Sequence, residues 1–146
     1  MALKYEDLTG KIIGCAMKVH SKMKSGYKEI IYSRCLAIEF DRAGIKYNRE
    51  MEWPIYYDGV IVGRKRVDYM IEDTISLELK AVRELTDKEL NEGLNYLESH
   101  NLEIGLLINF GGTSLEFKRL FNKKYNPNKN PGNPANPSNP GSNPLL

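Results

Sequence analysis

The first part of the chain repeats apolar residues with the period of an α-helix. A first helix is predicted over residues 6–23, where one face collects Leu8, Ile12, Cys15, Ala16, Val19 and Met23. The stretch 24–26 interrupts this pattern, and a second helix is predicted over residues 27–43. Gly44 suits the C-cap of that second helix. The domain is therefore expected to begin with two consecutive helices.

The pattern then changes to the two-residue period of β-strands. Strand-like segments are predicted at residues 46–57, 62–71 and 74–82. Because Pro54 has no backbone N–H, the first segment is expected at the edge of a sheet, or to end at the proline.

A third helix and a buried strand are predicted next. Thr86 and Glu89 have the spacing of a capping box for a helix over about residues 87–100, whose core face is Leu90, Leu94 and Leu97. The apolar run 104–110 is typical of a strand covered on both faces. Residues 114–121 are too few to assign. The order α-α-β-β-β-α-β predicts an α/β domain, with helices packed on a mixed sheet.

The last 24 residues differ from the rest in composition. They contain three lysines and no acidic residue, and six Asn-Pro dipeptides lie between Asn126 and Pro144. Each proline removes a backbone donor, and few large apolar residues are available to offset the entropy of ordering. We expect residues 1–122 to form one domain and residues 123–146 to form a disordered or polyproline-II-like tail. The tail is interpreted as inert, with a spacer or peptide ligand as the alternative.

The formal net charge of +2 comes from that tail. Without it, 18 basic residues stand against 19 acidic ones. A domain of this charge does not attract nucleic acid globally, so any polyanion must bind to a local patch. Cys15 and Cys35 form no C-x-x-C pair, and no apolar run is long enough to span a membrane. We therefore expect reduced thiols and a cytoplasmic location.

Candidate chemistry lies on the third strand-like segment. Glu78 and Lys80 are two residues apart, so they share a face opposite the apolar positions 75, 77, 79 and 81. Asp68, on the preceding segment, joins them only if it lies opposite Glu78. A three-residue loop at 72–74 gives that register, whereas a two-residue turn sends Asp68 to the other face.

Two carboxylates and a lysine on one face suit metal-assisted hydrolysis. Hard oxygen ligands of this kind prefer Mg²⁺ or Mn²⁺. A metal ion there would polarise a phosphoryl oxygen, and Lys80 would orient water or stabilise the growing charge. The alternative is an ordinary Glu–Lys ion pair on a solvated strand face.

Glu29 is the third candidate acid. It has helical spacing from Tyr32, Leu36 and Phe40, so it is expected on the core-facing side of the second helix. A buried carboxylate needs a cation or strong donors. The alternative is a partly exposed acid at the start of a helix, where the macrodipole favours it. We expect Glu29, Asp68 and Glu78 to converge on a space that could hold a metal ion.

The segment from Gly26 to Tyr32 matches the pattern G-x-x-E-x-x-Y, and the chain resembles the GxxExxY family of PD-(D/E)XK nuclease-like proteins. Blocks at residues 11–20, 67–68, 77–82 and 106–110 follow the family order, and the resemblance covers about residues 8–110. It implies a PD-(D/E)XK nuclease-like core with Mg²⁺ or Mn²⁺ as cofactor. The implied metal ligands are Glu29, Asp68, Glu78 and the backbone carbonyl of Leu79, and the implied catalytic lysine is Lys80.

Some residues depart from the pattern expected of such proteins. Where related proteins commonly carry Q-x-x-x-Y, this chain has Glu92 and Tyr96, so the neutral residue has become an acid. Glu92 would either add a metal ligand or repel a phosphate. Arg66 should share a face with Asp68. It is interpreted either as a contact to a phosphate or as an ordinary solvent-exposed residue at the start of a strand. These three residues are the candidates for substrate binding.

The two histidines are interpreted as structural. His20 is expected to pack or cap at the end of the first helix, and His100 is expected on the surface near the end of the third.

Three functions follow from these observations. The first is a metal-dependent nuclease-like protein that hydrolyses phosphodiester bonds of DNA or RNA. The second is a nuclease-fold adaptor or binding subunit, with a weak or inactive site, that works with a protein partner or a second copy of itself. The near-neutral domain favours this second function. The third is a small structural domain that displays the Asn-Pro tail.

Overall fold

The computed structural model describes residues 5–129 and contains eight regular elements within that range. They are α1 (Glu6–Met23), α2 (Glu29–Ala43), β1 (Tyr47–Tyr57), β2 (Val60–Ile71), β3 (Ile75–Lys80), α3 (Asp87–Ser99), β4 (Ile104–Asn109) and β5 (Glu116–Phe121). The predicted mixed α+β architecture and the order of its first seven elements are confirmed. The eighth element, β5, occupies the segment that the sequence pattern left unassigned.

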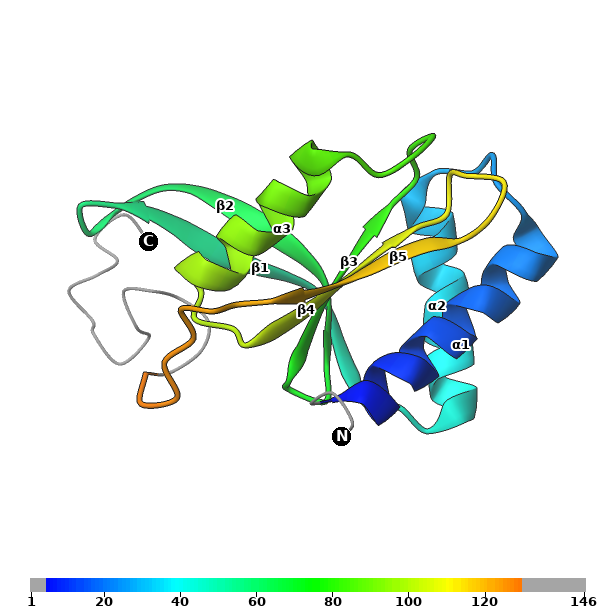
Figure 1. Ribbon diagram of the computed structural model, residues 1–146, viewed down its shortest axis with the longest axis horizontal. Helices are drawn as coiled ribbons and strands as arrows, with labels where there is room; N and C mark the ends of the chain where they lie inside the picture. Colours follow the sequence, from blue (N-terminus) through cyan, green and yellow to red (C-terminus); the bar gives the residue numbers. More distant parts are fainter. Residues whose placement is uncertain (1–4, 130–146) are drawn as a thin grey trace.

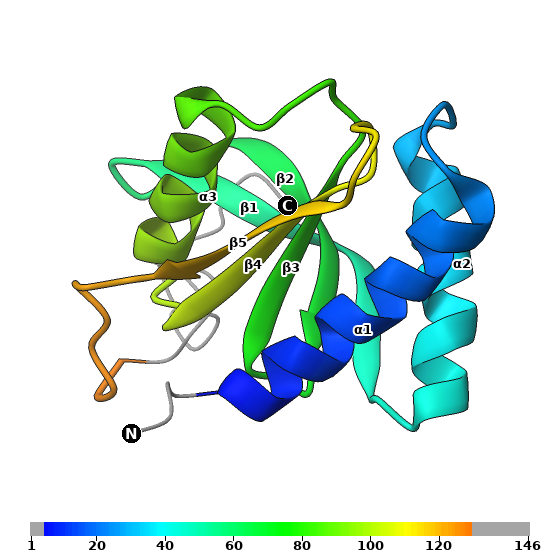
Figure 2. The same cartoon turned by 45° about the vertical axis from the view of Figure 1, so that its right-hand side comes forward.

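The elements form three layers. Helices α1 and α2 lie together on one face of the sheet, and α3 crosses the other face (Figures 1 and 2). The larger apolar cluster joins α1 and α2 to the sheet, with Ile12, Leu36 and Leu77 fully buried. A smaller cluster lies under α3 and includes Val67 and Leu97. The amphipathic faces predicted for the helices are therefore the faces that pack on the sheet.

The sheet is mixed and has the order β1-β2-β3-β4-β5. Strands β3 and β4 are parallel, and the other neighbours are antiparallel. Strand β4 is buried along its whole length because helices cover both faces of the sheet there. Strand β1 forms an edge, where the missing N–H of Pro54 is tolerated, as predicted.

The predicted helix caps are present. The Thr86 hydroxyl and backbone N–H donate to Oε1 of Glu89, at 2.8 and 2.6 Å, and this capping box begins α3. Gly44 closes α2 in the left-handed conformation, with φ of 71°. Local sequence signals therefore define these two helix ends.

Tyr32 fixes the loop between α1 and α2. Its ring is fully buried and stacks on Phe110, with centroids 4.6 Å apart. Its hydroxyl donates to the Lys24 carbonyl oxygen at 2.5 Å and accepts from the Tyr27 backbone N–H at 3.2 Å. The tyrosine of the G-x-x-E-x-x-Y pattern thus anchors the loop that leads to Glu29.

Substitution of Tyr32 by phenylalanine is expected to lower the free energy of unfolding by about 1 kcal/mol, because the ring stays packed while two hydrogen bonds are removed. Urea denaturation measures this change. Tyr27→Phe, an exposed ring in the same loop, is the matched control and should change stability much less. Equal effects of the two substitutions would contradict this role of the Tyr32 hydroxyl.

The described chain continues past β5 into residues that the sequence assigned to the tail. Residues 123–129 form turns, and the Asn101 side chain donates to the carbonyl oxygens of Asn126 and Lys129 at 2.8 and 3.0 Å. The rest of the predicted tail, residues 130–146, lies outside the described residues.

Among residues 5–129, no helix is both long enough and apolar enough to cross a membrane.

Candidate active site

The candidate site lies where β2 and β3 separate. The two strands pair at Tyr69 with Leu77, Met70 with Ser76, and Ile71 with Ile75, across a three-residue connection. Continued by one step, this register places Asp68 opposite Glu78, as predicted. Backbone pairing ends before that step, and the Asp68 carboxylate instead accepts the Leu79 N–H at 2.7 Å. The Asp68 side chain therefore takes the place of a ladder hydrogen bond.

Two lysines neutralise Glu78. The Lys80 ammonium lies 3.3 Å from one carboxylate oxygen, and the Lys65 ammonium lies 3.6 Å from the other. Lys80 also approaches Glu92 at 3.8 Å. Burial alone would lower the pKa of Lys80, but the charge and hydrogen bond of Glu78, with Glu92 and Glu29, outweigh it and raise that pKa. Lys80 is therefore charged and held between acids.

Glu29 differs from its predicted position. Tyr32, Leu36 and Phe40 are fully buried, whereas Glu29 is exposed, so the expectation of a core-facing carboxylate is wrong. The physical reason is that Glu29 is the first residue of α2, where the helix emerges from the core. Partial burial and the charge of Asp68 still raise its pKa, while Lys80 and the Ala81 backbone N–H oppose that rise. Glu29 is therefore electrostatically coupled to Asp68, Lys80 and Glu78 although it is exposed.

Asp68 is the more buried of these two acids. Burial raises its pKa, the Leu79 N–H opposes that rise, and the charge of Glu78 adds to it. An ionised Asp68 is therefore held at a free-energy cost in the folded protein, which a cation between Asp68 and Glu78 would relieve.

Asp68→Asn is expected to flatten the pH dependence of stability, measured by urea denaturation in EDTA. Because the folded pKa lies above the unfolded value of roughly 3.9, the folded protein binds the proton more tightly. Wild-type stability should therefore fall as the pH rises from the unfolded pKa through the folded one. Asparagine has no proton to lose, and its amide oxygen still accepts the Leu79 N–H.

Asp73→Asn, in the exposed β2–β3 connection, is the control and should follow the wild-type profile. A wild-type profile that runs parallel to that of Asp68→Asn would contradict the raised pKa.

The expected convergence of Glu29, Asp68 and Glu78 on a metal-binding space is not found in the described part of the chain, because Glu29 lies at the exposed start of α2 and Glu78 is paired with Lys65 and Lys80. Within residues 5–129, no group of three or more His, Cys, Asp or Glu side chains is drawn together closely enough to hold a metal ion. The chemistry of the three acids nevertheless fits a hard divalent cation, because carboxylate oxygens are the ligands such ions prefer. In addition to burial, the charge of Glu78 raises the pKa of both Asp68 and Glu29, as a shared cation site would require of neighbouring carboxylates. The two lysines supply the compensating positive charge.

The candidate substrate-binding residues fall into different environments. Tyr96 is 5% exposed, and its hydroxyl has no hydrogen-bond partner among the described residues. Burial, Glu78 and Asp68 raise the pKa of this phenol. Glu92 is exposed and paired with Lys80. Arg66 is exposed, and its charge acts on Asp68.

Lys65 was not predicted from the sequence as a site residue. It pairs with Glu78, and its ammonium lies 5.5 Å from the centre of the Tyr96 ring. Its position in the basic run 64–66 gives a weak signal, but only the three-dimensional path of β2 shows which member of the run turns toward Glu78.

Asn109 was also missed, although it ends an otherwise apolar strand. It is fully buried, and its amide binds the Val82 N–H and carbonyl oxygen, both at 2.9 Å. The same side chain contacts Gly111 N–H at 3.0 Å and Glu116 at 2.8 Å. It thereby fixes the chain that leaves β3 directly after Lys80. A polar residue within an apolar run is the sequence signal that could have identified it.

The histidines are both buried. His20 packs near Phe110, and its Nε2 lies 3.0 Å from the Gly112 carbonyl oxygen, as its predicted packing role requires. The prediction for His100 is wrong, because it is 3% exposed and packs on Tyr96 and Trp53, with ring centroids 4.5 and 5.0 Å away. The long β1–β2 hairpin carries Trp53 over the end of α3 and covers this histidine.

Comparisons with known proteins bear on this arrangement. Searches of curated proteins and of solved structures each gave no significant match. The sequence model of the PD-(D/E)XK nuclease superfamily matches residues 6–120, a range that contains all candidate site residues and every element of the fold except the last residue of β5. The chain therefore belongs to the PD-(D/E)XK nuclease superfamily.

Proposed function

We propose that this domain hydrolyses phosphodiester bonds of DNA or RNA with the help of Mg²⁺ or Mn²⁺. One observation carries the proposal. The register of β2 and β3, when continued by one step past the last paired residues, brings Asp68 across from Glu78, and Lys80 lies 3.3 Å from Glu78. Two carboxylates that repel each other beside a charged lysine suit the binding of a cation and the stabilisation of a phosphoryl group.

Each residue has a separate part in the proposed reaction. Asp68 and Glu78 would hold the cation, with Glu29 and the Leu79 carbonyl as further oxygen ligands. When bound, a divalent ion polarises a phosphoryl oxygen and acidifies water. The Leu79 N–H fixes the orientation of Asp68. Lys80 would orient the attacking water or stabilise the negative charge that develops on the phosphate.

The remaining candidates would contact the substrate. The Tyr96 hydroxyl is buried beside the acids and would donate a hydrogen bond, while Arg66 would meet a phosphate from the exposed side. Glu92 restrains Lys80 through their ion pair. The G-x-x-E-x-x-Y segment supports assignment to the GxxExxY branch, and the free thiols Cys15 and Cys35 support a reducing, cytoplasmic environment.

Thermal unfolding in EDTA, Mg²⁺ and Mn²⁺ tests the metal site. A ligand of the folded state at 100 times its dissociation constant adds about 2.7 kcal/mol of stability, so the melting temperature should rise with either metal. Asp68→Ala and Glu78→Ala should abolish the rise, and Asp73→Ala should retain it. A metal-induced rise that survives both site substitutions would contradict the proposed ligands.

The second candidate function is an adaptor or binding subunit. The observation that favours it is the neutralisation of Glu78 by Lys65 and Lys80, which satisfies the site without an added cation. A melting temperature that does not change on addition of Mg²⁺ or Mn²⁺, together with tight binding of a protein partner, would support this function over catalysis.

A further inference from the structure

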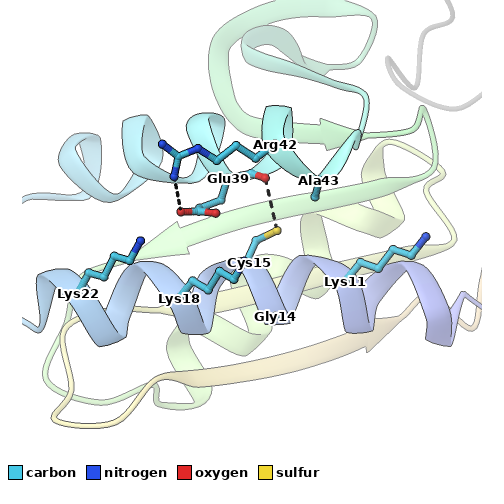
Figure 3. A pocket seen from close by; sticks show the side chains of 8 residues that line it. All are labelled: Lys11, Gly14, Cys15, Lys18, Lys22, Glu39, Arg42 and Ala43. Atoms are coloured by element: carbon cyan, nitrogen blue, oxygen red, sulfur yellow. Dashed lines mark hydrogen bonds and ion pairs between the residues drawn. The ribbon is translucent and has the colours of Figure 1, made fainter.

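An open groove runs between α1 and α2. Its volume is about 460 Å³. Lys11, Lys18 and Lys22 line it from α1, and Glu39 and Arg42 line it from α2 (Figure 3).

The lysines form a row along the groove. They are separated by seven and four residues, so they lie on one face of α1, about 10.5 and 6 Å apart along the helix axis. None of the three has an ion-pair partner among residues 5–129. Their positive charge is therefore available to a ligand.

The single acid in the groove does not cancel this charge. Glu39 is 8% exposed and pairs with Arg42 at 3.4 Å, and the Cys15 thiol donates to its backbone carbonyl oxygen at 3.8 Å. The Arg42 side chain remains 67% exposed. The accessible rim of the groove is consequently basic on both sides.

The floor permits close approach to the backbone of α1. Gly14 lies between Lys11 and Lys18, and a Cβ atom added there would meet no other atom within 4 Å. A chain lying along the groove can therefore contact the helix between the lysines.

We propose that this groove binds the sugar–phosphate backbone of a nucleic acid. A row of flexible lysines matches a strand that carries one phosphate per 3.4 Å of helical rise, and it needs no base sequence. Because the domain outside the basic tail is close to neutral, affinity for a polyanion must come from such a local patch. The row ends at Lys22, close in the chain to the loop that presents Glu29. This inference rests on the proposed function and assigns a second contact surface to the same substrate.

The test compares two triple variants with equal changes in charge. One removes the row, as Lys11→Gln, Lys18→Gln and Lys22→Gln. The other removes three exposed lysines outside the groove, as Lys46→Gln, Lys88→Gln and Lys118→Gln. Fluorescence anisotropy with a labelled 20-nucleotide strand and a 20-base-pair duplex, in EDTA at 50–200 mM salt, measures binding without cleavage.

The groove variant should bind roughly 10- to 100-fold more weakly, and its salt dependence should decrease by roughly 0.7–0.9 in slope for each phosphate that the variant no longer neutralises. The control variant should stay close to wild type. Equal weakening in both variants, unchanged binding by the groove variant, or no binding by the wild type would overturn the inference. Equally tight, lysine-dependent binding of polyglutamate would also overturn it, in favour of an acidic protein partner.

Cleavage assays separate the two proposals. Groove-dependent binding by a protein that cuts nothing would refute the nuclease but retain the groove. Metal-dependent cleavage that is insensitive to the three groove lysines, together with unchanged binding, would support the nuclease and refute the groove.

Discussion

Lys80→Ala is expected to reduce metal-dependent phosphodiester cleavage by roughly 10²- to 10³-fold, the usual effect of removing one group that stabilises transition-state charge. The fold should survive, because Lys65 still neutralises Glu78 when Lys80 is absent. Single-turnover cleavage of a labelled oligonucleotide in Mg²⁺ or Mn²⁺ measures the decrease, and the metal-induced rise in melting temperature should persist.

Lys88→Ala, an exposed lysine at the start of α3, is the matched control and should cleave at the wild-type rate. If Lys80→Ala kept full activity, the lysine would serve only the ion pair with Glu78 and Glu92. If the Lys80→Ala variant lost metal binding as well as activity, Lys80 would position the carboxylates rather than act on the phosphate.

Asn109→Ala is expected to destabilise the protein by about 2–4 kcal/mol. The substitution removes four hydrogen bonds and leaves the partly buried Val82 backbone groups without their partner. Urea denaturation measures the change. Since Val82 follows the end of β3, cleavage should also fall at temperatures where the variant remains folded.

Asn91→Ala, at an exposed position of α3, is the corresponding control and should change stability by less than about 0.5 kcal/mol. A stable Asn109→Ala protein with unchanged activity would show that the end of β3 is held by the β3–β4 ladder alone.

Much of the fold could be predicted from local signals. The apolar face of α1 and the capping box of α3 each lie within one element, so the sequence period and the cap spacing were enough. The register of β2 and β3 was also predictable, because a short connection fixes which residues oppose each other. That register identified Asp68, Glu78 and Lys80 as one group.

Features that depend on tertiary packing could not be predicted. Strand β5 is short, and its pairing with the buried β4 defines it more than its own pattern does. The exposure of Glu29 depends on where α2 leaves the sheet, and the burial of His100 depends on the long hairpin that carries Trp53 over it. Helical spacing describes a face but not how far along the helix the core extends.

The packing of Trp53 gives the molecule an optical probe of its own. It is the single tryptophan in the chain, and its indole lies 6.0 Å from the Tyr96 ring and 5.0 Å from the His100 ring. A protonated imidazole beside an indole quenches emission, and burial lowers the pKa of His100, so quenching should begin only at a pH below the ordinary range of histidine. Unlabelled protein should therefore report, through the emission of one fluorophore, the protonation of His100 at the end of α3.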